Sequence, residues 1–193
     1  GILPADATRS TIVTDLPASA DVVIVGGGAI GAATAFYLAR AGVRVAYATL
    51  LGDDPYSGDI VGLANAEGIS TDLIGRLAGR NAGLYLIEAS ATGERSFHYW
   101  RDRAPARELF DAPMPTLLQS IQCARIVYLS GITLSLYTPA SLDRLEKALN
   151  AARAAGARIA MDGNFRPRGW AGDFARAQAT FDRFWGLADI ALP

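Results

Sequence analysis

The sequence has very few residues that bind metals or form disulfides. Of its 193 residues only one is a cysteine, Cys123, and only one is a histidine, His98. A single cysteine excludes an internal disulfide, and no cluster of cysteines and histidines has the spacing of a metal site. This cysteine usage is typical of a reducing compartment, so we expect a cytoplasmic protein without a bound metal of that kind.

Long hydrophobic runs and an excess of one charge are also absent. No run approaches the about 18 consecutive apolar residues of a membrane span, and the N-terminal stretch lacks the basic start and apolar core of a secretion signal. The 18 basic and 19 acidic residues are interspersed, which argues against a nucleic-acid-binding stripe. We therefore expect neither a membrane nor a nucleic acid as partner. Because all but one of the basic residues are arginine, a small anion held by a few guanidinium groups is favoured.

What the sequence does contain is an alternation of strand and helix patterns. Residues 1–20 have no period and indicate a loosely ordered leader, whereas the apolar run at 22–25 ends in glycines and precedes a helical pattern over 29–41. The alternation predicts an α/β fold, a doubly wound parallel sheet with its ligand crevice at the carboxyl ends of the strands. The chain stops at a strand pattern, so we expect it to be truncated there. The other expected strands are 43–50, 125–129, 158–161 and 190–192, and the other expected helices are 56–67, 116–122, 139–155 and 173–185.

One region departs from this alternation. Residues 84–89 and 95–101 alternate apolar and polar positions around a turn at 91–94, which predicts a β-hairpin inserted between βα units. We expect this hairpin to form a lid over about residues 70–101. An exposed hairpin with an apolar face is also a natural pairing edge, so a homodimer through the lid is one expected interaction.

The sequence GGGAIG at 26–31 has the G-x-G-x-x-G spacing of a dinucleotide-binding turn. It follows a strand and opens a helix, where backbone N–H groups can hold a pyrophosphate. Residues 21–42 resemble the start of FAD-dependent amino-acid oxidases, but Thr49 stands where such enzymes need an acid for the ribose. The alternative is a tight turn whose glycines only allow close packing of helix and strand. The resemblance implies FAD as cofactor, bound by Gly26, Gly28 and Gly31.

Several separated motifs follow residue 42, at 45–48, 51–58, 67–69, 83–86, 93–101, 129–134 and 162–167 with Trp170. They occur in the order found in the 2-keto-3-deoxygluconate kinases of the ribokinase (pfkB) family, which the chain resembles from residue 43 to residue 193. The resemblance implies a ribokinase-like fold, with a Rossmann-like strand, turn and helix over 21–42 and the N-terminal part of a kinase domain over 43–193. The Leu-Ala-Arg-x-Gly end of the preceding helix, at 38–42, also fits, although the asparagine that the family presents to the sugar is replaced near Ala33.

The residues of these motifs suit a keto-deoxy sugar acid, which offers one carboxylate and several hydroxyls. Arginines can form planar, charge-assisted hydrogen bonds to the carboxylate, and tyrosines can supply an apolar wall with a polar tip. Tyr99 and Arg101 are two apart on an expected strand and so share one face. The alternative is that the tyrosines pack the lid and the arginines are solvated surface charges. The candidate substrate-binding residues implied by the resemblance are Tyr85, Tyr99, Arg101, Gly131, Ile132 and Arg166.

The catalytic part of such a kinase is missing from the sequence. Ribokinase-family enzymes take the catalytic Asp and an anion-holding helix N-terminus from a Gly-Ala-Gly-Asp motif, which this chain does not contain. ATP and magnesium are implied as cofactors with most of their site outside the chain, so we expect no catalytic residue here and no activity from the chain alone. The leading hypothesis is a sugar-acid kinase; the alternatives are an FAD-dependent oxidoreductase fragment and a non-catalytic α/β interaction module.

Overall fold

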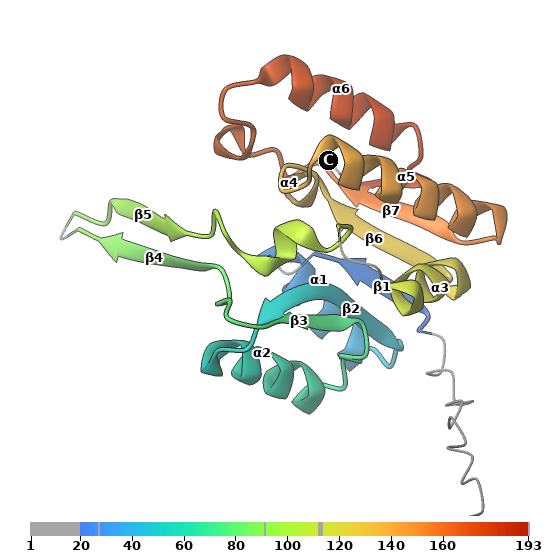
Figure 1. Cartoon of the computed structure of the whole chain (residues 1–193), viewed down its shortest axis with the longest axis horizontal. Helices are drawn as coiled ribbons and strands as arrows, with labels where there is room; N and C mark the ends of the chain where they lie inside the picture. Colours follow the sequence, from blue (N-terminus) through green and yellow to red (C-terminus); the bar gives the residue numbers. More distant parts are fainter. Residues whose placement is uncertain (1–19, 27, 91, 112–113, 193) are drawn as a thin grey trace, which may run out of the picture.

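The computed structural model describes residues 20–26, 28–90, 92–111 and 114–192, so the predicted leader lies outside the described residues apart from Ala20. These residues form a six-stranded sheet, a separate two-stranded hairpin and helices on both faces of the large sheet (Figure 1). The strand order is β3-β2-β1-β6-β7-β8, and all of its pairings are parallel. The strands are β1 Val22–Val25, β2 Val45–Gly52, β3 Ile74–Leu77, β6 Ile126–Ser130, β7 Arg158–Asp162 and β8 Ile190–Leu192, and the hairpin strands are β4 Leu84–Ala89 and β5 Arg95–Trp100.

The central strands are mostly apolar because helices cover both of their faces. Every residue of β1 and of β2 is buried, as expected for strands of a parallel sheet between two helical layers. Successive side chains of a strand point to opposite faces, so Val22 and Ile24 belong to one core cluster, and Val23 and Val25 belong to the other. The helices are α1 Ala29–Arg40, α2 Pro55–Ala66, α3 Pro115–Cys123, α4 Gly131–Leu134, α5 Pro139–Ala154 and α6 Phe174–Trp185, with short 3-10 turns η1 Pro105–Glu108 and η2 Pro167–Trp170.

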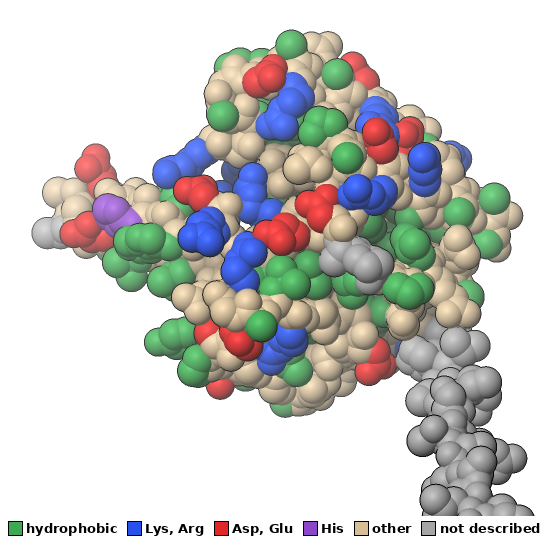
Figure 2. All heavy atoms as spheres, in the orientation of Figure 1, with side chains coloured by type: hydrophobic (Ala, Val, Ile, Leu, Met, Phe, Trp, Pro, Cys, Tyr) green, Lys and Arg blue, Asp and Glu red, His purple; other side chains and the backbone are tan. Residues whose placement is uncertain are grey.

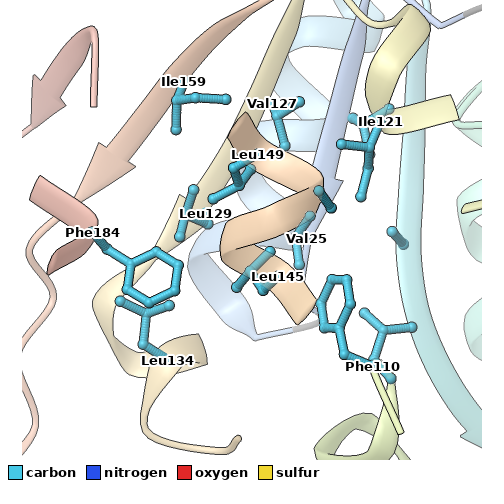
Figure 3. Packing of buried hydrophobic residues seen from close by; sticks show 14 of the residues in the cluster. Val25, Phe110, Ile121, Val127, Leu129, Leu134, Leu145, Leu149, Ile159 and Phe184 are labelled. Carbon is cyan, nitrogen blue, oxygen red and sulfur yellow. The ribbon is translucent and has the colours of Figure 1, made fainter. Parts of the chain in front are cut away.

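The two core clusters show which helices cover which face. Helices α1 and α2 pack on one face, through residues such as Ala35 and Ala64, and α3, α5 and α6 pack on the other. Figure 3 shows the larger cluster, in which Leu145 and Leu149 of α5 lie against Val127 and Leu129 of β6. The leucines of α5, which recur at helical spacing, therefore face the sheet, as the sequence predicts.

The chain changes direction along the sheet between β1 and β6. From β1 it moves outward to β2 and β3 with α1 and α2 on one face, and from β6 it moves the other way to β7 and β8 with α5 and α6 on the opposite face. In open α/β sheets ligands bind at such a reversal, outside the carboxyl ends of the strands. The predicted doubly wound α/β sheet is confirmed, and the fold places its crevice beside Gly26 and Ser130.

The predicted β-hairpin is also confirmed, and it projects from the body of the protein (Figure 1). Its antiparallel register pairs Tyr85 with Tyr99 and Leu86 with His98. The lid begins later than residue 70, however, because β3 pairs in parallel with β2 in the main sheet and Ser70 forms a bridge to Ala46. A four-residue strand that contains a glycine and an arginine has too little alternation to be recognised from the sequence.

The segment 21–42, predicted as a separate Rossmann-like unit, sits in the middle of the main sheet. Strand β1 pairs with β2 on one side and with β6 on the other. Its strand, turn and helix therefore share one core with the rest of the described chain. Among the helices of the described residues, none is both long and apolar enough to cross a membrane.

Candidate functional site

A cleft of about 530 Å³ lies at the carboxyl ends of β1, β6 and β7, with the hairpin along one side. The βα1 turn, the end of β6, the loop after β7 and the inner face of the hairpin all line it. Figure 2 shows basic side chains, interspersed with acidic ones, on the surface where the hairpin meets the body. Because β1 and β6 are the strands between which the strand order reverses, the cleft lies at that reversal. The residues predicted from the sequence that line it are Gly26, Gly28, Gly31, Tyr85, Tyr99, Arg101, Ile132 and Arg166.

Gly131 was also predicted to belong to the site, but it lies under the cleft and does not line it. A side chain at this position would overlap the carbonyl oxygen of Gly163 and the ring of Phe181. The glycine therefore lets the short helix α4 pack directly against the loop after β7, while its neighbour Ile132 reaches the cleft.

The glycine-rich turn has steric reasons for two of its three motif glycines. Gly26 has a φ of +105°, and a side chain there would overlap Thr133; a Cβ on Gly31 would come within 2.5 Å of the Gly26 carbonyl oxygen. A side chain on Gly28 would meet nothing within 4 Å. The G-x-G-x-x-G spacing thus serves close packing of β1, α1 and α4, which favours the packing interpretation of these glycines.

The two aspartates that follow β2 accept hydrogen bonds from backbone amides near the start of the hairpin. The strand extends three residues beyond Thr49, and Asp53 and Asp54 come next. The carboxylate of Asp53 accepts a hydrogen bond from Gly79 N–H at 3.0 Å, and that of Asp54 accepts one from Ala82 N–H at 2.9 Å. Both carboxylates therefore bind backbone amides at the base of the lid.

The inner face of the hairpin is an aromatic wall. The ladder register places Tyr85 opposite Tyr99 and Ile87 opposite Phe97 on one face, and the tyrosine ring centroids are 6.0 Å apart. The Phe97 ring is stacked on Tyr99 at 6.2 Å and also lines the cleft. Phe97 was not among the predicted site residues, although its position two residues before Tyr99 is a signal for the same face. His98 lies on the other face, where its Nε2 is 3.3 Å from the Glu88 carboxylate.

Three arginines enter the cleft, and no aspartate or glutamate lines it among the described residues. The Cζ atom of Arg101 lies 4.5 Å from the centroid of the Tyr99 ring. Arg166 stands directly before η2, and Arg168 lies within that turn, with its Cζ atom 4.4 Å from the same Tyr99 ring. The side chains that line the cleft therefore carry a net positive charge, which favours an anion. Arg168 was not predicted, because nothing in a loop sequence indicates that its side chain reaches the hairpin.

A polar network forms the floor of the cleft. Asp162 accepts hydrogen bonds from the hydroxyl of Tyr128 and, at 2.8 Å, from the hydroxyl of Ser130. Asn164 donates to Ser130 at 3.2 Å and has the unusual positive φ of 23°. Burial, followed by the hydrogen bond to the Asp162 carboxylate, raises the pKa of Tyr128, so its hydroxyl stays protonated and donates. Tyr128, Ser130 and Asn164 all line the cleft, and Tyr128 and Ser130 were missed because they read as ordinary strand residues.

Comparisons with known proteins agree with this architecture. A family model described as pfkB family carbohydrate kinase matches residues 6–193. The 2-dehydro-3-deoxygluconokinase of Dickeya dadantii (strain 3937) is 40% identical over 164 residues, which are 82% of this chain and 53% of the relative. The solved 2-dehydro-3-deoxygluconokinase from Thermotoga maritima aligns with a TM-score of 0.75 and 26% identity, over 88% of this chain and 58% of that one. The fructokinase with bound ATP from Xylella fastidiosa aligns with a TM-score of 0.71 and 24% identity, over 89% and 57% of the two chains.

These matches also define the extent of the likeness. The chain spans about half the length of the curated relatives it matches. The family match includes the glycine-rich turn and α1 as well as the residues from 43 onward, so the resemblance seen in the separate motifs is confirmed over nearly the whole chain. The chain belongs to the pfkB family of carbohydrate kinases.

Proposed function

We propose that this chain supplies the sugar-acid-binding part of a kinase for 2-dehydro-3-deoxygluconate, also called 2-keto-3-deoxygluconate. The observation that carries the proposal is the cleft itself, where three arginines and an aromatic wall meet without a lining acid among the described residues. A keto-deoxy sugar acid matches this combination, because it presents one carboxylate and an otherwise uncharged body. The relative from Dickeya dadantii bears the name of this activity, which supports the same substrate class.

In this proposal the arginines bind one part of the ligand and the tyrosines of the hairpin bind another. Arg101 and Arg166 bind the carboxylate, since guanidinium groups form charge-assisted and often bidentate hydrogen bonds to carboxylates. Tyr85 and Tyr99 cover the carbon chain, and their hydroxyls can accept or donate to the sugar hydroxyls. Ser130 and Asn164, held by Asp162, add polar groups on the floor of the cleft.

The phosphoryl donor of the whole protein is proposed to be ATP with magnesium. ATP is present in the fructokinase of similar fold, and phosphoryl transfer depends on positioning and on charge stabilisation of the phosphates. The described residues contain no group of three or more acidic, histidine or cysteine side chains that could hold a metal. We therefore assign no magnesium ligand to the described residues, and we propose that they bind and orient the sugar acid.

Titration of the chain with 2-dehydro-3-deoxygluconate, followed by amide chemical shifts, tests the proposed binding site directly. We expect shifts at residues 97–101 and 164–168, with fructose as the uncharged comparison ligand. Binding of the sugar acid no tighter than that of fructose would contradict a carboxylate site. A hybrid in which this chain replaces the matching half of the Dickeya relative tests the activity: it should phosphorylate the sugar acid with ATP, and Arg166→Ala should impair it.

We also propose that the outer face of the hairpin joins two copies of the chain. Leu84, Leu86 and Trp100 lie on this face and are 60%, 56% and 61% exposed. Large apolar side chains gathered on one exposed ribbon are typical of a protein–protein contact. Sedimentation equilibrium should show a dimer that Trp100→Lys weakens, whereas Leu63→Lys on α2, where the leucine is 68% exposed, should have no effect. A monomer at all concentrations would refute this interface.

A further inference from the structure

The Tyr99 ring is the point at which the hairpin and the body of the protein meet inside the cleft. Arg101, from the end of the hairpin, and Arg168, from η2 on the body, both place their guanidinium groups over this one ring. An arginine within about 6 Å of a tyrosine centroid is attracted by the negative face of the ring. Both arginines meet this criterion, at 4.5 and 4.4 Å.

The contact of Arg168 is distinctive because it crosses from one part of the protein to the other. The hydrogen bonds and ion pairs of residues 84–100 in the described chain are made within the hairpin, as in the ladder and the His98–Glu88 pair. The aromatic pairs of the hairpin are internal as well. For the described residues, Arg168 on Tyr99 is thus the one polar or cation–aromatic contact between these hairpin residues and the body.

Arg168 is fixed at its base, whereas the hairpin is exposed. The turn η2 is anchored by Trp170, which is 1% exposed and lies 5.9 Å from the Phe181 ring. A side chain on Gly169 would come within 2.5 Å of the Ser135 hydroxyl, so the turn packs tightly on the end of α4. By contrast, every residue of β4 is exposed. An exposed arginine side chain on a tightly packed turn therefore meets an aromatic ring on an exposed hairpin.

The charges around Tyr99 give Arg168 a second relation to the ligand. Arg101 and Arg168 carry like charges over the same ring, and no ion pair with an acidic residue is formed by either of them within the described chain. Their repulsion opposes closure of the hairpin, and an anion bound by Arg101 weakens this repulsion. The attraction between Arg168 and the Tyr99 ring and the binding of an anion by Arg101 then both favour the closed hairpin.

We propose that Arg168 is a positioning residue that holds the hairpin over the cleft through the Tyr99 ring, and so keeps Tyr99 and Arg101 in place for the ligand. The identity of the ligand rests on the proposed function, but the contact between the two residues does not. Arg168 acts through Tyr99 and is not itself a main ligand of the carboxylate.

The contact of Arg168 with Tyr99, called the latch below, is tested first without any ligand, so that a wrong substrate assignment does not affect the result. Backbone ¹⁵N relaxation is measured for the chain, for Arg168→Met and for Arg168→Lys. We expect the hairpin amides to gain independent motion in Arg168→Met and to recover part of their order in Arg168→Lys, which keeps a cation. Arg95→Met removes an exposed hairpin charge outside the cleft and should match the parent. Unchanged hairpin relaxation in Arg168→Met would overturn the proposal.

A double-mutant cycle then separates a latch from a direct ligand. Loss of one exposed cation–aromatic contact corresponds to about two- to fivefold weaker binding of the sugar acid in Arg168→Met. If Arg168 acts through the ring, Tyr99→Leu abolishes this effect, so that adding Arg168→Met to Tyr99→Leu costs no further affinity. Equal losses in both backgrounds would make Arg168 a direct carboxylate ligand and refute the latch. The amide spectrum of β6 and β7 reports folding in every variant. If Arg168→Met unfolds, Arg168→Gln takes its place in the cycle.

Discussion

Substitution of the cleft glycines by alanine tests whether the glycine-rich turn is a packing device. Gly26 combines a positive φ of +105° with a neighbouring Thr133 side chain, whose Cγ2 atom would lie 2.9 Å from an added Cβ. Gly28 belongs to the same motif but has an extended φ of −76° and nothing within 4 Å of an added Cβ. The two positions therefore make a matched pair in one turn.

The expected magnitudes follow from these two environments. An alanine at Gly26 must adopt an unfavourable backbone conformation, which costs about 1–3 kcal/mol, and must displace Thr133, which adds about 1–3 kcal/mol. We therefore expect Gly26→Ala to lower the free energy of unfolding by about 2–4 kcal/mol, because the two effects are partly relieved together. Gly28→Ala should change it by less than about 0.5 kcal/mol, as surface substitutions usually do.

Urea unfolding followed by circular dichroism measures both values on the same chain. The prediction depends on the difference between the two variants, because the unfolded chain loses similar freedom in each. Equal stabilities of Gly26→Ala and Gly28→Ala would refute the steric argument. Loss of nucleotide binding in a stable Gly28→Ala protein would instead favour the dinucleotide interpretation of the motif.

Three further predictions concern the ligand, the core and the pH dependence of stability. Arg166→Ala should weaken binding of the sugar acid by about 10- to 150-fold, the equivalent of one charged hydrogen bond, and leave fructose binding unchanged in isothermal titration; an equal loss for both sugars would mean that Arg166 is structural. Leu149→Ala should lower the free energy of unfolding in urea by about 2–5 kcal/mol, because Leu149 of α5 is completely buried against the sheet, and a loss below about 1 kcal/mol would show that the cluster in Figure 3 is loosely packed. Hydrogen bonds from the Ser57 hydroxyl, and then from backbone amides including that of Ala82, hold the pKa of Asp54 below its ordinary value of 3.8 against the effect of burial. The stabilisation that the ionised Asp54 provides is therefore present above pH 3.8 and is lost as the pH falls through the pKa of the folded state. Urea midpoints measured from about pH 6 downward should fall less steeply in Asp54→Asn, and identical slopes would show that Asp54 does not contribute.

Regular elements were predictable from the sequence because each carries its own period. The buried strands β1 and β6 are apolar runs, α5 repeats leucines at helical spacing, and the hairpin alternates at period two. The elements that were missed are short: β3 has four residues including a glycine, α4 is a single turn, and η1 and η2 are 3-10 turns of four residues each. None of them is long enough for a period to appear in the sequence.

The site was predictable to the extent that a family motif or a shared strand face marks its residues. Tyr99 and Arg101 share a face, and Arg166 follows a strand at the predicted edge of the sheet. The contact of Arg168 with Tyr99 depends on how the hairpin folds over the body, which no local pattern encodes. Gly131 was predicted as a ligand-side residue, but the constraint on it is the space taken by Phe181.

The parallel pairing of β1 with β6 has a consequence for the order in which the protein folds. Val22 pairs with Ile126, so this contact closes a loop that contains β2, β3 and the whole lid. Closing so long a loop is entropically unfavourable until both strands have something to pack against, and folds rich in such distant contacts form slowly. The hairpin closes a turn of only a few residues and can form early, before the cleft exists. The lid and the β1–β2–β3 unit are therefore expected to appear first in time-resolved hydrogen exchange, and the junction of β1 with β6, which creates the cleft, is expected to be the slow step.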